Sequence, residues 1–220
     1  MRNWNHRVYI IPVLIFAAPV LAQSFLEPAP SIWDFRSARP TTFFAAATDT
    51  LLRGFAANRI AQCVCLPGQG QEWAISLERT NSTRWIIRAN VPRGSLGMSS
   101  IEDPVQIFVQ IASLVVDRYS KPIDSERGEA IKRVFTRILK QTRYAPKSER
   151  SSWGSVRFYF SVERRWPQSY SGVADNPEPG TPPHRLCKLA FRLMKYATSP
   201  KSSDIPLLKE IDLWLASLGG

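Results

Sequence analysis

Histidine and cysteine, the residues that most often carry acid–base, nucleophilic and metal chemistry, are scarce in this sequence. Its 220 residues include two histidines and three cysteines. Histidine is the side chain whose charge ordinarily changes near neutral pH, and the cysteine thiolate is the usual sulfur nucleophile and metal ligand. Few catalytic schemes therefore remain open to this chain.

Charge is plentiful but unequal in sign. The chain has 29 Lys and Arg against 18 Asp and Glu, for a formal net charge of +11. Hydrophobic residues make up 44% of the chain and charged residues 21%. These proportions are typical of a globular protein and exclude a disordered tail or a fibre.

The first 22 residues have the form of a secretory signal peptide. Arg2 and Arg7 precede an apolar run over residues 8–21, and small residues near Ala22 offer a cleavage site. The run of about 14 residues is shorter than the roughly 20 that span a bilayer, which argues against a membrane anchor. We therefore expect cleavage after Ala22 and an exported protein, either periplasmic or secreted.

Removal of residues 1–22 would change the composition that matters for function. The remaining 198 residues hold 27 basic and 18 acidic side chains, a net charge of +9, and His184 as their one histidine. Residues 23–40 contain three prolines and scattered aromatics, which predict an extended N-terminal arm. We expect residues 41–220 to form a single domain.

The pattern of apolar residues predicts both helices and strands. Helical spacing, or an almost wholly apolar sequence, occurs over residues 41–58, 105–119, 124–142, 181–197 and 203–218. Strand-like sequence occurs over residues 62–66, 73–78, 85–91 and 156–163. Because strands and helices are grouped, we expect an α+β fold, with a single antiparallel sheet of about four strands covered by four to five helices. The prolines and glycines of residues 164–183 predict a loop.

The excess of positive charge is confined to two segments. Residues 121–147 hold eight Lys and Arg against three acids, and residues 184–201 hold five and none. On the two predicted helices these residues form rows, one of Arg133, Arg137 and Lys140 and one of Arg185, Lys188, Arg192 and Lys195. The rows are either solvated faces or a surface for an anionic partner, such as an acidic protein or an anionic envelope component. Export argues against nucleic acid as that partner.

A second candidate binding region is the predicted loop after the last strand. Arg164, Arg165, Trp166 and Tyr170 combine the residue types that are enriched at the energetic centres of protein interfaces. The alternative is that these aromatics pack locally and only order the loop.

The three cysteines are expected to be oxidised in part, as is usual in exported proteins. Cys63 and Cys65 face the same way on one predicted strand, and a bond between them would be strained. We therefore expect Cys187 to form a disulfide with Cys65 or with Cys63. The alternative is a zinc site made of these cysteines and His184, but the spacing of the first pair and the oxidising compartment argue against it. No cofactor or metal is expected.

These observations favour a non-enzymatic exported binding protein. In its most concrete form, this would be an inhibitor or immunity-type protein that recognises another envelope macromolecule through the basic helix faces and the Arg/Trp loop. One alternative is an envelope-acting hydrolase that uses paired carboxylates, which sequence spacing alone does not pair. Another is a structural accessory of a secretion or envelope assembly.

Overall fold

The fold is described from a computed structural model of the chain. The described residues are 26, 43–56, 59–67, 70–81, 84–95, 109, 111, 113–142, 156–163 and 169–219. The predicted signal peptide, nearly all of the predicted N-terminal arm, and Arg164, Arg165 and Trp166 lie outside them. Among the described residues, no helix is both long enough and apolar enough to cross a membrane.

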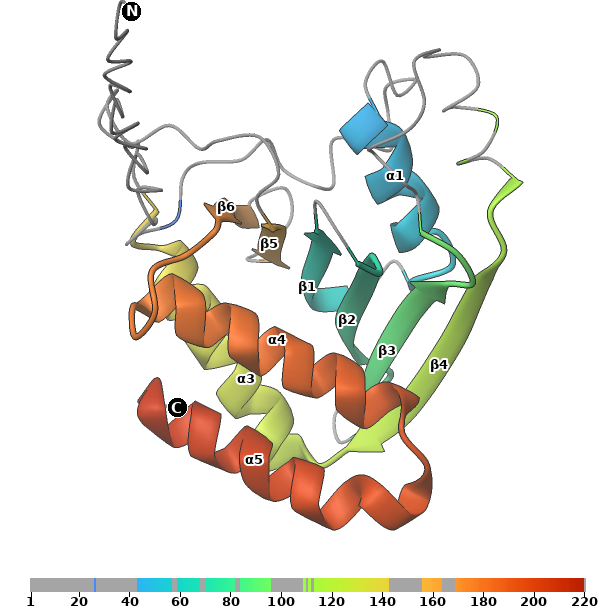
Figure 1. The fold of residues 1–220 in the computed structure, drawn as a ribbon. Helices are drawn as coiled ribbons and strands as arrows, with labels where there is room; N and C mark the ends of the chain where they lie inside the picture. Colours follow the sequence, from blue (N-terminus) through green and yellow to red (C-terminus); the bar gives the residue numbers. More distant parts are fainter. Residues whose placement is uncertain are drawn as a thin grey trace, which may run out of the picture.

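A single antiparallel sheet of six strands forms the centre of the protein (Figure 1). The strand order is β4-β3-β2-β1-β5-β6, so β4 and β6 form the edges. The strands are β1 (Arg59–Leu66), β2 (Trp73–Arg79), β3 (Trp85–Pro92), β4 (Val116–Ile123), β5 (Arg157–Glu163) and β6 (Ser169–Asp175). The α+β class is as predicted, but the expected number of about four strands is wrong.

The first of the two missed strands is β4, which includes the end of the predicted helix over residues 105–119. It pairs with β3 along its whole length, from Val116 opposite Pro92 to Ile123 opposite Trp85. Residues 109, 111 and 113 are helical, as predicted. Val115 and Val116, just before and at the start of β4, are β-branched and favour a strand once a pairing partner is present. Pro122 cannot donate a hydrogen bond to a sheet, but an edge strand tolerates this. From Val116 onward, pairing with β3 thus outweighs the apolar pattern that predicted a helix.

The second missed strand, β6, lies in the segment predicted to be a loop. It pairs with β5 from Ser169 opposite Glu163 to Asp175 opposite Arg157. The prolines of this segment flank the strand and do not interrupt it. Gly172 lies inside this strand, at a position where space is limited. A Cβ there would come within 3.1 Å of side-chain atoms of both Leu139 and Leu26. This glycine reflects close packing, where the sequence pattern suggested a break.

Four α-helices are described, together with the short 3-10 helix η3 (Lys201–Ser203). They are α1 (Phe43–Leu52), α3 (Ser125–Leu139), α4 (Pro182–Thr198) and α5 (Asp204–Ser217). The helices α3, α4 and α5 occupy predicted stretches, whereas α1 ends several residues before the predicted end at 58. The side chains of Asp124 and Thr181 cap α3 and α4 by accepting backbone hydrogen bonds.

Both faces of the sheet carry a hydrophobic core. On one face, Cys63 and Cys65 of β1 join a large cluster with residues of α3, α4 and α5. On the other, Val64 and Leu66 join a smaller cluster with α1. Successive residues of a strand point to opposite faces, so β1 contributes to both clusters and is buried along almost all its length. The helices α3, α4 and α5 lie together on one side in Figure 1 and α1 lies apart from them.

Close packing between α3 and β3 gives a test of this arrangement. Gly128 lies in the first turn of α3, and an added Cβ would stand 2.5 Å from an atom of the Trp85 ring. Alanine ordinarily stabilises a helix by about 1 kcal/mol relative to glycine. Here the overlap with a buried ring should prevail, because overpacking typically costs about 1–3 kcal/mol.

We therefore expect Gly128→Ala to lower the free energy of unfolding by about 1–3 kcal/mol, measured by urea denaturation. Gly94→Ala is the matched control, since no heavy atom lies within 4 Å of a Cβ placed there. That control should change stability by less than about 0.5 kcal/mol. A Gly128→Ala protein as stable as the wild type would contradict the packing of α3 on Trp85.

Candidate functional site

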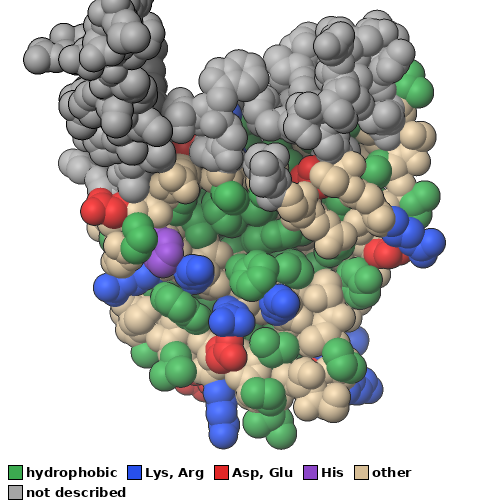
Figure 2. Space-filling model, viewed as in Figure 1, with side chains coloured by type: hydrophobic (Ala, Val, Ile, Leu, Met, Phe, Trp, Pro, Cys, Tyr) green, Lys and Arg blue, Asp and Glu red, His purple; other side chains and the backbone are tan. Residues whose placement is uncertain are grey.

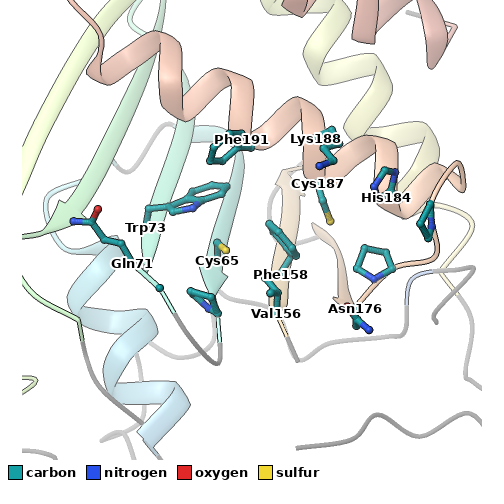
Figure 3. A pocket seen from close by; sticks show the side chains of 14 residues that line it. Cys65, Gln71, Trp73, Val156, Phe158, Asn176, His184, Cys187, Lys188 and Phe191 are labelled. Atoms are coloured by element: carbon teal, nitrogen blue, oxygen red, sulfur yellow. The ribbon is translucent and has the colours of Figure 1, made fainter. Parts of the chain in front are cut away.

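A pocket of about 690 Å³ lies between α4 and the ends of β1, β2 and β5. The turn that follows β6 closes one side, and Figure 3 shows the lining side chains. In the space-filling view, hydrophobic side chains gather beside the row of Lys and Arg along α4 (Figure 2). The volume falls within the range of about 300–1,000 Å³ that is typical of ligand pockets.

One wall of the pocket is a row in which a small residue lies between two aromatic residues. Cys65 pairs with Trp73 of β2 on one side and with Phe158 of β5 on the other, so the three form one row across the sheet. The rings of Trp73 and Phe158 lie 6.1 Å apart, with a T-shaped orientation. Phe191 of α4 lies 6.4 Å from Trp73 and completes an aromatic wall. Phe158 and Phe191 are only partly buried, so their rings are accessible from the pocket.

The rim of the pocket is polar and carries one full charge. Gln71, Asn176, His184 and Lys188 line it, and none of the lining residues described is Asp or Glu. Gln71 donates a hydrogen bond of 2.7 Å to the carbonyl oxygen of Pro92, which fixes its side chain. Lys188 is exposed and points from α4 along the pocket edge (Figure 3). The pocket therefore presents an apolar wall beside a positive rim.

His184 is a neutral hydrogen-bond donor at this rim. Its Nδ1 atom accepts a hydrogen bond of 3.3 Å from the backbone N–H of Gly180. Burial lowers the pKa of His184, and the nearby charges of Lys188 and Arg185 lower it further. The neutral ring with an unprotonated Nδ1 carries its proton on Nε2. His184 can therefore donate a hydrogen bond from Nε2.

All three cysteines are buried free thiols, so the predicted disulfide is not present in the structure. Cys65 and Cys187 nevertheless line one pocket, and Cys63 belongs to the same core. Burial raises the pKa of Cys65 to about 12, with a further contribution from the charge of Glu72. Burial likewise raises the pKa of Cys63 and of Cys187 well above the usual value. In the folded protein the three thiols are therefore held in the protonated form at neutral pH.

The alternative zinc site is also not assembled. Among the described residues, no group of three or more His, Cys, Asp and Glu side chains is placed to hold a metal ion. His184 instead accepts the backbone hydrogen bond from Gly180.

The predicted basic row on α4 is divided by contacts with α5. Arg185 donates a hydrogen bond of 3.0 Å to the carbonyl oxygen of Ser217, and Arg192 forms an ion pair of 2.8 Å with Glu210. Lys188 and Lys195 remain exposed, and the ammonium group of Lys195 lies 5.4 Å from the centre of the Phe191 ring. The row is therefore not one free surface, since only its two lysines border the pocket wall.

The row on α3 is likewise divided. Arg137 donates a hydrogen bond of 2.7 Å to the carbonyl oxygen of Gly219, just after α5. Lys140 lies 6.0 Å from the ring centre of Tyr170, so two predicted site residues contact each other away from the pocket. Arg133 is exposed. Of the predicted Arg/Trp loop, only Tyr170 is described, and it lies in β6 partly buried against the core.

Two carboxylates lie close together, but in an ion-pair network. Asp124 and Asp212 both contact the guanidinium group of Arg127, at 2.5 Å and 2.7 Å. Burial would raise the pKa of Asp124, but hydrogen bonds from the backbone and side chain of Arg127 outweigh this and lower it. A carboxylate held in its charged form by Arg127 is unsuited to act as a general acid. This pair therefore gives the predicted hydrolase no active site.

Several pocket residues were not among the predicted site residues. Trp73 and Phe158 follow strand alternation in the sequence, which is typical of core residues, and no sequence pattern distinguishes Phe191. Their common position depends on strand register, which pairs Cys65 with both aromatics. The spacing of Lys188 and Phe191 could have indicated that they share one face of α4, since residues three apart on a helix are neighbours.

The raised pKa of Cys65 predicts a loss of stability at alkaline pH. Between about pH 9 and about pH 12 the unfolded chain loses the thiol proton while the folded protein keeps it. Unfolding then releases a proton, so the free energy of unfolding falls as pH rises, by about 1.4 kcal/mol per pH unit for one thiol.

Cys65→Ala should therefore flatten the decline in unfolding free energy between pH 9 and pH 10 by about this amount, measured by urea denaturation at several pH values. The same experiment should find three titratable thiols in unfolded, unreduced protein. One titratable thiol in unfolded, unreduced protein would instead restore the disulfide prediction.

Comparisons with known proteins identify no relative, so the function is inferred from the structure. The chain matches no protein-family model, and neither the curated proteins nor the solved structures include a match.

Proposed function

We propose that this protein is a non-enzymatic binding protein that recognises a partner protein through the pocket beside α4. The main support is the row formed by Phe158, Cys65 and Trp73 beneath α4, which leaves an accessible aromatic hollow next to Lys188. Accessible apolar surface of this kind commonly marks a binding site in a folded protein. An inhibitor or immunity-type role remains the most concrete form of this proposal.

The chemistry of the pocket favours binding over catalysis. Its two thiols are held in the protonated form, which is a poor nucleophile. None of the described lining residues is a carboxylate that could act as general acid or base. The described hydrogen bond of the His184 ring is with the backbone N–H of Gly180, and the Thr181 hydroxyl accepts from the His184 backbone N–H as a helix cap. These features support binding over the alternative of a carboxylate-dependent hydrolase.

The proposal also changes which residues carry recognition. Arg185, Arg192 and Arg137 are attached to α5 or to the residue that follows its C-terminal cap, so we no longer assign them to the binding surface. Lys188 and Lys195 keep that role because both border the aromatic wall. The pocket thus replaces the basic helix faces as the centre of the proposed site.

Export is the second part of the proposal, and it rests on the signal-peptide pattern of residues 1–22. Expression of the whole chain in a bacterial host should yield an exported protein that begins at Gln23. Intact mass and N-terminal sequencing would measure this, with Arg2→Glu/Arg7→Glu as the variant in which the positive flank is lost. An uncleaved chain that stays in the cytoplasm would contradict export.

Site-specific crosslinking tests the proposed recognition site. A photoreactive phenylalanine analogue at position 191 should crosslink one partner protein in an envelope extract of the source organism. The same analogue at Lys209, which is exposed on α5, is the matched control and should not crosslink that protein. Mass spectrometry would identify the product.

A Phe191→Ala change should then weaken binding of the purified partner by at least about tenfold, since truncation of an aromatic anchor typically costs 2 kcal/mol or more. Equal crosslinking from positions 191 and 209, or unchanged affinity of Phe191→Ala, would argue against this pocket as the recognition site. Turnover of the partner by the purified protein would argue against the non-enzymatic assignment.

A further inference from the structure

We propose that the pocket receives an apolar segment of the partner protein that is flanked by an acidic residue, whose carboxylate binds Lys188. This inference rests on the proposed function and specifies the chemistry of the partner. Charge complementarity at the rim and the accessible rings of the wall carry it.

The wall of the pocket selects for an apolar group. Trp73 is buried except for a small fraction of its surface, while Phe158 and Phe191 are only partly buried. An apolar side chain placed against them would remove both its own surface and these rings from water, at about 25 cal/mol for each Å². The volume of about 690 Å³ is that of a pocket for a drug-sized ligand, which suits a short apolar segment.

The rim of the pocket selects for negative charge. Lys188 is exposed, and no partner among the described residues neutralises it. Two acids of the adjoining strands are already engaged, while Glu178, in the turn between β6 and α4, is exposed. Asp175 forms an ion pair of 2.5 Å with Arg157, and Glu72 is buried and accepts a hydrogen bond from the hydroxyl of Ser95.

Of the lining residues that the structure describes, Lys188 is the one Lys or Arg, and the neighbouring arginines of α4 are engaged elsewhere. Arg185 and Arg192, one turn before and one turn after it, are attached to α5. Lys195 lies further along the helix, where its ammonium group covers the ring of Phe191. His184 adds a neutral donor one turn before Lys188. A carboxylate at this rim would thus meet one ammonium group and one imidazole N–H.

Two matched peptides test the inference. Both are acetylated, amidated hexapeptides with a central Leu-Phe-Leu-Phe segment; one has Glu at both ends and the other has Lys. Fluorescence anisotropy with the purified protein should show at least about tenfold tighter binding of the Glu peptide, a difference of about 1.4 kcal/mol. Added salt should reduce that preference, because the lysine is exposed.

Three variants locate the effect. Lys188→Gln should weaken binding of the Glu peptide about tenfold and leave the Lys peptide no weaker, whereas Phe191→Ala should weaken both. Lys209→Gln removes the same charge from an exposed position on α5 and should change neither affinity. Circular dichroism would verify that each variant is folded.

Each other outcome overturns the inference. The inference of an acidic flanking residue is contradicted if the two peptides bind equally, or if neither binds at millimolar concentration. It is also contradicted if Lys188→Gln binds the Glu peptide with unchanged affinity. Tighter, Lys188-dependent binding of dodecanoate would point to a free amphipathic acid, and a Phe191-dependent dimer in sedimentation would point to a second copy. A partner that crosslinks at position 191 but binds Lys188→Gln as tightly as the wild type would support the proposed function. It would contradict the assignment of Lys188 to an acidic residue of that partner.

Discussion

The helix α5 is attached to the rest of the domain by burial of Ile211 and Leu215 in the core, and pairs of opposite charges fix its position. Each of its three acids contacts a base on a different element: Asp204 pairs with Lys121 of β4, Glu210 with Arg192 of α4, and Asp212 with Arg127 of α3. The Arg127–Asp212 pair is bidentate, with two contacts of 2.7 Å. Such geometry holds a helix in register better than the typical exposed ion pair, which contributes about 0–1 kcal/mol.

The C-terminal end of the same helix is held by two of the predicted site residues. Arg185 of α4 and Arg137 of α3 donate hydrogen bonds to carbonyl oxygens of Ser217 and Gly219. The last carbonyls of a helix lack partners within the helix and carry partial negative charge, so cations are favourable there. Three of the predicted basic residues, Arg137, Arg185 and Arg192, therefore contact α5 or the residues at its end. Lys188 and Lys195 lie beside the aromatic wall of the pocket, and Arg133 and Lys140 lie on α3.

The parts of the fold that follow from local sequence were predictable, and the parts that follow from distant pairing were not. The apolar stripes and capping residues of α3 and α4 identify these helices directly. By contrast, β4 and β6 are edge strands whose existence depends on β3 and β5. Taken alone, Pro122 and Gly172 are residues that disfavour a strand. Pro122 is tolerated because β4 is an edge strand, and Gly172 is required by its close contact with Leu139. The pocket needs the register of three strands, so composition alone did not reveal it.

The same register brings the aromatic rings of the pocket together. Cys65 is small, so the rings of Trp73 and Phe158 on either side of it contact each other, with their centroids 6.1 Å apart. The neutral thiol of Cys65 adds little polarity to the wall. The cost is aromatic surface that stays in contact with water, since Phe158 and Phe191 remain partly exposed. A partner that covers these rings would recover the burial that the fold itself leaves incomplete, which connects the packing of β1 to the binding proposed for α4.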